Sequence, residues 1–331
     1  MPKRFDTAVV IGKFYPPHRG HKLLVETALA QAERVTVFVV HQEAQSIPGA
    51  LREKWMKEIH PAADVRLVLQ TLDDDDTPGW AAWTVRELGY VPDAAFTSEE
   101  YGPRWAKAMG CAHVMVDNAR VRVPVSGTAV RANPYANWEY LEPCVRAHFA
   151  KRVCVLGAES TGTTTMARAL AEHYRTAWVP EYGRFYSEGK YVADGHVWTT
   201  DEFAHIARIQ SSTEDWLARS ANKVLVCDTD SFATTIWHER YMGVPSAAVR
   251  EIADARRYDL YLLTGDEIPF EQDGVRDGEH LRHWMHGRFE EALRESGRPF
   301  AVLRGPHEDR LRAAVALVDT VMAREGAAQA A

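Results

Sequence analysis

One stretch constrains the fold of this chain more than any other, and it runs from Arg152 to Leu170 with the sequence RVCVLGAESTGTTTMARAL. It begins with a short β-branched apolar run, continues through small polar residues from Gly157 to Gly162, and then shows apolar residues at helical spacing. This order predicts a strand, a glycine-rich loop and a helix. Such a loop binds phosphate because its backbone N–H groups and the positive end of the helix point at the same place. Since the stretch lies halfway along the chain, we expect a second fold to begin here.

The loop departs from the common pattern G-x-x-x-x-G-K-[S/T] at a single position, because Thr163 stands where the pattern has lysine. A lysine would place a point charge between the β- and γ-phosphates during phosphoryl transfer. The backbone and helix contributions do not depend on that lysine, so we still predict a nucleotide site. A strand-to-helix turn without a ligand is the alternative. The predicted nucleotide-binding residues are Gly157, Ser160, Thr161, Gly162, Thr163 and Thr164.

Length, charge and cysteine spacing narrow the class of protein. A chain of 331 residues exceeds what one hydrophobic core usually organises, so we predict domains at residues 1–150 and 151–326 and a disordered tail at 327–331. The net charge of −7 argues against a general nucleic-acid binder. The lack of any apolar run of about 20 residues argues against membrane insertion. Four widely spaced cysteines and an N-terminus without a signal-peptide profile predict reduced thiols in a cytoplasmic protein, with a homo-oligomer left open.

Short apolar runs alternate with segments of helical periodicity in both halves. This alternation predicts parallel β-sheets with right-handed crossovers, and ligands at the carboxyl ends of the strands. We therefore predict an α/β protein with a Rossmann-like sheet in the first domain and a phosphate-loop kinase-like sheet in the second. The strands expected are Thr7–Ile11, Val35–Val40, Val65–Leu69, Ala94–Thr97 and Val114–Val116, then Arg152–Leu156, Thr176–Val179, Val224–Cys227, Leu260–Leu263 and Phe300–Leu303.

The decapeptide from Gly12 to His21, GKFYPPHRGH, follows the first expected strand. Its first glycine and its prolines favour a sharp exit from the strand, and Gly20 allows the next helix to begin close to a phosphate. His18 and His21 share a helix face, so both could donate, as imidazolium or neutral rings, to one triphosphate. For the pair alone, two solvent-facing residues are the simpler interpretation, but the flanking glycine, aromatic and proline residues favour phosphate binding. Metal binding is disfavoured because no further ligands occur nearby at metal spacing.

A second motif lies late in the first half, from Val125 to Arg131, with the sequence VSGTAVR. Ser126 would cap a helix that opens at Gly127, and hydroxyls, backbone N–H groups and Arg131 would then converge on the phosphates opposite the histidines. An ordinary capped helix explains the serine and glycine equally well. Together and in this order, the two motifs resemble those of the nucleotidyltransferase superfamily, a glycine-aromatic-proline loop with His-x-Gly-His and a Ser-Gly-Thr-x-x-Arg segment.

Other candidate residues lie between these two motifs. Trp80 and Trp83 follow an acidic run at residues 73–76 and could stack on a flat pyridinium base, although core packing is the more common role. We expect the acidic run to be a solvated loop. The nucleotide-binding residues predicted in the first half are Gly12, Lys13, Phe14, Gly20, Ser98, Arg120, Ser126, Gly127 and Thr128, and the predicted catalytic residues are His18, His21 and Arg131.

In the second half, an apolar strand ends in Asp228. A phosphate-loop kinase holds Mg²⁺ with an aspartate at such a place and with the loop hydroxyl, here Thr164. A turn or cap is the ordinary role of a strand-terminal aspartate. The segment at residues 273–278 contains two glycines and predicts a mobile lid, whose Arg276 and nearby Arg282 could close over phosphates.

The order of these segments resembles one family over nearly the whole chain, the bifunctional nicotinamide mononucleotide (NMN) adenylyltransferase and ribosylnicotinamide kinase of the NadR type. After the glycine loop, the resemblance is carried by Glu181-Tyr182-Gly183-Arg184, Asp228-Thr229-Asp230 and Asp-Gly-x-Arg. It implies that the second half phosphorylates nicotinamide riboside with ATP and Mg²⁺. It implies further that the first half joins NMN to AMP from ATP, which gives NAD and pyrophosphate. The residues expected to bind substrate are Trp80, Trp83, Tyr182 and Arg184, and Glu181 or Asp230 is expected to position the ribose or accept its proton.

Some members of that family carry an N-terminal helix-turn-helix, and since the first strand begins by Thr7 we expect none here. Two alternatives stay open. The second half could sense nucleotides without catalysis, because Thr163 replaces the lysine. The first half could instead act on another phosphorylated acceptor, such as a cytidylyl or pantetheine acceptor.

Overall fold

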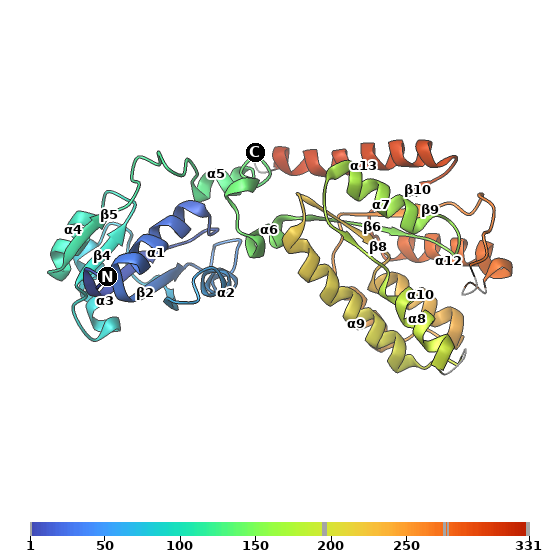
Figure 1. The fold of residues 1–331 in the computed structure, drawn as a ribbon, viewed down its shortest axis with the longest axis horizontal. Coiled ribbons are helices and arrows are strands. Elements are labelled where there is room, and N and C mark those ends of the chain that lie inside the picture. The colour runs from blue at the N-terminus through green and yellow to red at the C-terminus, as the bar shows by residue number, and fades with distance from the viewer. Residues whose placement is uncertain (1, 194–196, 274–275, 277, 329–331) are drawn as a thin grey trace. The chain divides into compact units, whose positions relative to one another are not determined.

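A computed structural model of the chain describes residues 2–193, 197–273, 276 and 278–328. The chain divides into two compact units, Met1–Val145 and Arg146–Ala331. Each unit contains a five-stranded sheet whose neighbouring strands run parallel. Helices alternate with the strands along both units (Figure 1). The predicted α/β fold with two parallel sheets is confirmed.

The sheet of the first unit has the strand order β3-β2-β1-β4-β5. Its central strand is therefore the one that leads into the decapeptide. The strands are β1 (Phe5–Gly12), β2 (Ala32–His41), β3 (Asp64–Leu69), β4 (Ala94–Thr97) and β5 (Ala112–Met115). The helices are α1 (Arg19–Gln31), α2 (Gly49–Ile59), α3 (Thr77–Leu88), α4 (Gly102–Met109) and α5 (Gly127–Ala132), followed by the 3-10 helix η1 (Trp138–Tyr140) and by α6 (Pro143–Phe149) at the boundary between the units.

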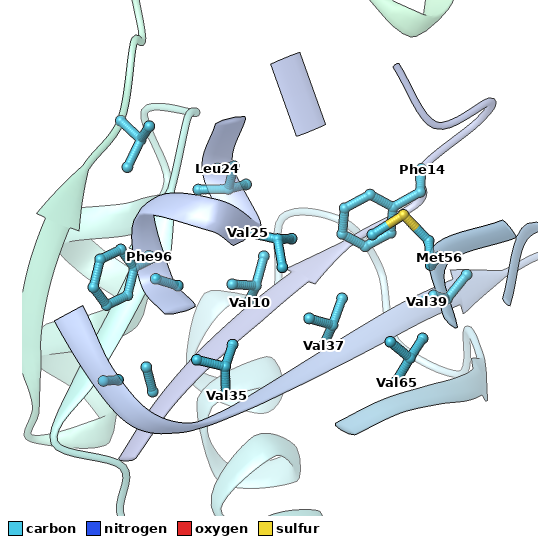
Figure 2. Packing of buried hydrophobic residues seen from close by; sticks show 14 of the residues in the cluster. Val10, Phe14, Leu24, Val25, Val35, Val37, Val39, Met56, Val65 and Phe96 are labelled. Atoms are coloured by element: carbon cyan, nitrogen blue, oxygen red, sulfur yellow. The ribbon is translucent and has the colours of Figure 1, made fainter. Parts of the chain in front are cut away.

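Side chains of β1 alternate between the two faces of this sheet, and helices bury both faces. Val10 belongs to a cluster with Leu24 of α1 and Met56 of α2, whereas Val9 belongs to a separate cluster with Trp105 of α4. Figure 2 shows the first cluster, which also holds the ring of Phe14. The loop after β1 is thus anchored in the core.

The sheet of the second unit has the order β10-β9-β6-β8-β7, so β6, which leads into the glycine loop, is again central. The strands are β6 (Lys151–Leu156), β7 (Trp178–Val179), β8 (Val224–Asp228), β9 (Leu260–Thr264) and β10 (Phe300–Leu303). The helices are α7 (Thr163–Tyr174), α8 (Tyr182–Ala193), α9 (Thr200–Leu217), α10 (Ser231–Met242), α11 (Ala247–Asp254), α12 (Arg282–Glu295) and α13 (His307–Ala328), with 3-10 helices η2 (Ala218–Ser220) and η3 (Glu279–Leu281). Val155 of β6 packs with Leu170 of α7 and Val318 of α13.

The C-terminal end differs from the prediction. Helix α13 continues to Ala328, so residues 327 and 328 are helical rather than part of a disordered tail, in keeping with the high helix propensity of alanine. Residues 329–331 lie outside the described residues. The four cysteines are free thiols, as predicted. In the ranges that the structure describes, no helix is long and apolar enough to cross a membrane.

Candidate active sites

His18 lies at the start of α1 and caps that helix with its own side chain. Its Nδ1 accepts a hydrogen bond from the Gly20 N–H at 3.1 Å. A Cβ atom on Gly20 would lie 3.0 Å from the His18 ring, so glycine lets the ring fold back over the helix N-terminus. Because Nδ1 accepts, a neutral His18 carries its proton on Nε2 and can donate it to a ligand.

The ring of His21 stacks on that of His18, with 3.7 Å between the centroids and 26° between the planes. Burial lowers the pKa of His18 to about 4, and the nearby positive charge of Arg120 adds to this effect. Burial likewise lowers the pKa of His21 well below its usual value. Both rings are therefore neutral at pH 7. Of the two forms predicted to donate hydrogen bonds, imidazolium and neutral imidazole, only the neutral one applies. His21 Nδ1 is buried and has no hydrogen-bond partner among the described residues.

The structure brings the two motifs of the first unit together at the backbone carbonyl of Tyr15. Arg131 donates from Nη1 to this oxygen and from Nη2 to the Thr128 hydroxyl at 3.2 Å. Its guanidinium lies 4.3 Å from the centre of the Tyr15 ring. A Cβ on Gly127 would come within 2.6 Å of the same carbonyl oxygen. The Ser126 hydroxyl caps α5, as expected.

The loop after β1 is also held by a buried arginine, Arg52, which the sequence reasoning missed. Arg52 of α2 is fully buried and donates to the carbonyls of Lys13, Val40 at 3.0 Å and Ile47 at 3.1 Å. The sequence could have indicated this role, because Arg52 shares a helix face with buried Met56 and a charged side chain on an apolar face requires partners. The loop backbone is thus fixed without a ligand.

Gly12 and Phe14 give this loop its close fit to the core. Phe14 has a positive φ of 44° and is buried. A Cβ on Gly12 would lie 3.3 Å from the Phe14 ring. These two predicted nucleotide-binding residues therefore shape the loop through packing, and their backbone is what a ligand could reach.

The basic residues predicted to reach the triphosphate are paired with acidic side chains. Lys13 Nζ lies 2.7 Å from an Asp74 carboxylate oxygen, and both side chains are exposed. Arg120 donates to Glu99 at 3.2 Å. Ser98 directly follows β4, at the carboxyl edge of the sheet. A bound triphosphate would have to compete with Asp74 for Lys13.

The two tryptophans of α3 pack against the core. The Trp80 indole N–H donates to the Asp73 carbonyl at 2.9 Å, and the Trp83 ring meets Phe38 edge to face with 5.0 Å between centroids. Both indoles pack on the cluster that contains Phe38 and Trp105. Core packing thus accounts for both side chains, and stacking on a base stays a prediction.

In the second unit, a cavity of about 440 Å³ opens between the glycine loop, the segment after β7 and the end of β8. Five of the site residues predicted for the second half do not line it within the described part of the chain: Thr161, Gly162, Tyr182, Asp230 and Arg282. The predicted residues that do are Gly157, Ser160, Thr163, Thr164, Glu181, Arg184, Asp228 and Arg276. An aromatic wall that the sequence reasoning missed comes from Trp178, Phe185, Trp198, Phe203, Trp237 and Tyr241.

The glycine loop is tied to the neighbouring strand β9. The hydroxyls of Thr161 and Thr264 are 2.7 Å apart, and a Cβ on Gly157 would lie 2.3 Å from the Thr264 hydroxyl. Gly162 and Ser160 have positive φ angles of 83° and 59°. Thr161 therefore fixes the shape of the loop and does not face the cavity.

Two arginines hold carbonyls of the glycine loop. Arg310 of α13 is buried and donates to the carbonyls of Thr161 at 2.9 Å and Gly265 at 3.1 Å. Arg282 donates to the Ser160 carbonyl at 2.9 Å, so it holds the loop rather than lining the cavity, contrary to the predicted closure over phosphates. Arg310 shares a helix face with buried Val318, the same signal that Arg52 gives in the first unit.

Asp228 and the two threonines of the loop form an oxygen-rich corner that suits Mg²⁺. Burial raises the pKa of Asp228 to about 6, and the nearby hydroxyls of Thr164 and Thr163 act in the opposite direction. Asp228 Oδ1 is buried and has no hydrogen-bond partner in the part of the chain that the structure describes. In the described ranges, no group of three or more His, Cys, Asp or Glu side chains could hold a metal. A magnesium ion here would therefore need phosphate oxygens or water as its other ligands.

Glu181 and Asp230 were equal candidates for the ribose, and the structure separates them. Glu181 lines the cavity, and burial together with the charge of Asp228 raises its pKa to about 8. Asp230 is fully buried, caps α10 through the Ala233 N–H at 2.8 Å and accepts from the Tyr261 hydroxyl at 2.8 Å. Both Asp230 oxygens are thus engaged in the fold, so the assignment of Asp230 to the ribose is wrong.

Of the remaining predicted residues, Arg184 and Arg276 line the cavity and Tyr182 does not. Arg184 bonds to Glu188 at 2.7 Å and to Asp273 at 2.8 Å, and Arg276 lies 3.2 Å from Asp273. The Tyr182 hydroxyl is 3.3 Å from His205. The predicted hinge at residue 274 lies outside the described residues.

Comparisons with known proteins found a family model and several similar proteins. A family model described as an AAA domain matches residues 152–310. The trifunctional NAD biosynthesis/regulator protein NadR of Salmonella typhimurium is 29% identical over 347 residues, covering 97% of this chain and 84% of that protein. Its namesake from Escherichia coli is 30% identical over 301 residues, covering 83% and 73%.

Two solved structures share the fold over nearly the full length. NadR protein in complex with NR has a TM-score of 0.78 at 22% identity and covers 98% of this chain and 97% of that one. NadR protein in complex with NAD and AMP-PNP has a TM-score of 0.75 at 21% identity and covers 96% of each. The identity and coverage of the Escherichia coli relative place the chain in the family: it belongs to the NadR family of NAD biosynthesis/regulator proteins.

Proposed function

We propose that the chain makes NAD in two steps, each in one unit. The second unit phosphorylates nicotinamide riboside with ATP, and the first unit transfers AMP from a second ATP to the NMN so formed. The observation that carries the proposal is the pairing of two phosphate-binding loops, each at the end of a central strand and each with its own reactive side chains. Membership of the NadR family supports the choice of substrates.

In the first unit, a phosphate oxygen of NMN attacks the α-phosphorus of ATP and pyrophosphate leaves. Negative charge grows on the phosphate oxygens during this step, and preorganised N–H donors stabilise it. Neutral His18 can supply its Nε2–H, and His21 supplies a second ring nitrogen beside it. No proton needs to be removed from NMN, so a neutral pair suffices.

In the second unit, the 5′-hydroxyl of nicotinamide riboside attacks the γ-phosphorus of ATP, and ADP leaves. The glycine loop supplies backbone N–H groups, and Asp228 with Thr164 would hold Mg²⁺, which offsets phosphate charge when bound. Glu181, on the wall of the same cavity, would accept the hydroxyl proton in its ionised form, whose share grows as the pH rises toward its raised pKa of about 8. The aromatic wall suits a flat nicotinamide ring.

The test uses the full chain with ATP and Mg²⁺. With NMN, we expect NAD and pyrophosphate in equal amounts, and with nicotinamide riboside we expect ADP first and NAD later. NAD from NMN without any ADP from riboside would favour a second unit that senses nucleotides, which the threonine at position 163 also allows. Transfer of a nucleotidyl group to another phosphorylated acceptor, with none to NMN, would overturn the nicotinamide assignment.

A further inference from the structure

The cavity of the second unit lacks the loop lysine, yet three arginines line it, Arg168, Arg184 and Arg276. The transferred phosphoryl group needs positive charge during phosphoryl transfer. The arginine that supplies it should be one whose guanidinium can reach the phosphates without first breaking an ion pair with a carboxylate. This inference rests on the proposed kinase activity of the second unit.

Arg184 and Arg276 both pair with Asp273, which lines the cavity as well. Arg184 bonds to this carboxylate at 2.8 Å and also to Glu188. Arg276 lies 3.2 Å from Asp273 and donates to the Glu271 carbonyl. Either guanidinium would have to leave an anionic partner before it could bind phosphate.

Arg168 is in a different situation. It follows Thr164 by four residues on α7, so both lie on one face of the helix, and the side chain of a helical residue leans toward the helix N-terminus, here the glycine loop. Its guanidinium carbon lies 4.5 Å from the centre of the Trp178 ring. It is exposed, and no ion pair joins it to a carboxylate within the described part of the chain.

Arg168 lines the same cavity as Thr164 and Asp228, the two residues proposed to hold Mg²⁺. The Trp178 ring, which also lines the cavity, offers the guanidinium a resting place that carries no negative charge to be displaced.

We propose that Arg168 supplies the positive charge that a lysine at position 163 would give, by turning from the Trp178 ring to the phosphate oxygens of ATP. As the bond from the riboside 5′-oxygen to the γ-phosphorus forms, the bond from that phosphorus to the β-bridging oxygen breaks, and its electron pair leaves with ADP. Arg168 gives up no proton in this step. It stabilises charge, while the hydroxyl proton goes to a base.

The experiment measures riboside-dependent ADP formation and, on the same protein, NAD formation from NMN. Arg168→Ala should lower the kinase kcat by about 100-fold or more, since arginines in this role contribute at least that much, and should leave NAD formation from NMN unchanged. Arg168→Lys should retain part of the rate, because it keeps the charge but not the two-point contact. Arg312→Ala is the matched control, because that side chain is exposed on α13 and outside the cavity.

The double variant Thr163→Lys/Arg168→Ala should have a kinase kcat at least tenfold higher than that of Arg168→Ala. A merely structural role of Arg168 would not allow this recovery. An Arg168→Ala kcat within about threefold of the parent, or a loss confined to KM for riboside, would overturn the inference. In that event Arg276→Ala should carry the loss instead. A parent chain that makes no ADP from riboside would overturn both this inference and the proposed kinase, which separates the two failures.

Discussion

The loop after β1 presents two stacked histidines that burial keeps neutral, whereas the loop after β6 presents threonine hydroxyls and is ringed by arginines. The two loops nevertheless keep their shape in the same way. Arg52 donates to the Lys13 carbonyl of the first loop, and Arg310 donates to the Thr161 carbonyl of the second, each from a buried position on a helix. The difference shows that the shape of a phosphate-binding loop and its chemistry depend on separate residues. The shape of a loop depends on side chains from elsewhere in the fold that donate hydrogen bonds to the loop carbonyls. The transfer of a nucleotidyl or phosphoryl group depends on side chains that face the ligand.

The largest effect should come from the histidine pair. His21→Ala should lower kcat for NAD formation from NMN by about 100-fold or more, the usual cost of losing a donor to developing charge, and should leave riboside phosphorylation intact. Coupled and separate assays on one preparation measure both. His307→Ala, at the start of α13, is the control. Equal loss of both activities would mean that the two loops serve one shared site.

Glu181→Gln should have the complementary effect on the second loop. Removing the proposed proton acceptor should slow ADP formation from riboside by about 100-fold and leave NAD formation from NMN at the parental rate. Initial rates with saturating ATP give the comparison, with Glu172→Gln on the exposed side of α7 as control. A change only in KM would make Glu181 a binding residue instead.

The contributions of Arg52 and Arg310 to stability can be tested separately. Arg52→Ala should destabilise only the first unit and Arg310→Ala only the second, each by about 3 kcal/mol, because several buried carbonyls lose their donor. Thermal unfolding followed by calorimetry reports both units. Arg312→Ala should leave both transitions in place, since that side chain is exposed. Loss of stability in the wrong unit would contradict the separation of the two folds.

Acid should weaken the first unit before the second. Burial lowers the pKa of His18 and of His60 to about 4, so the stability they contribute is full above 6.5 and is lost as pH falls toward 4. Between pH 7 and 5.5 we expect a loss of about 1 kcal/mol per histidine. In the second unit, burial raises the pKa of Glu214 to about 7, so its contribution is lost as pH rises instead. Calorimetry at both pH values tests this, with Arg52→Ala identifying the first unit's transition; equal shifts in both units would contradict it.

The smallest effect should come from the Lys13–Asp74 pair. Asp74→Asn should free Lys13 for the triphosphate and lower KM for ATP in NAD formation by no more than about fivefold, since an exposed pair contributes at most about 1 kcal/mol. Asp75→Asn is the control because Asp75 belongs to the same acidic run. A rise in KM would show that Asp74 positions Lys13 rather than competing for it.

Sequence reasoning succeeded where the cause of a structure is local. Apolar periodicity located the strands, and the serine cap at Ser126 followed from its immediate neighbours. It failed where a partner comes from a distant segment. Asp230 stands after a strand as a catalytic aspartate would, yet Tyr261 from β9 and the α10 cap take both its oxygens. Nothing near Arg310 in sequence shows that the carbonyl of Thr161 will be its acceptor.

The close approach of Gly127 to the Tyr15 carbonyl has a consequence for how such chains can change over time. A Cβ at position 127 would lie 2.6 Å from that oxygen. Any side chain there would therefore push the loop after β1 away from Arg131, which donates a hydrogen bond to the same carbonyl. Two segments more than a hundred residues apart therefore share one steric limit. We expect a saturation library of position 127 to yield only glycine among active clones, unless a second change first moves the backbone at Tyr15.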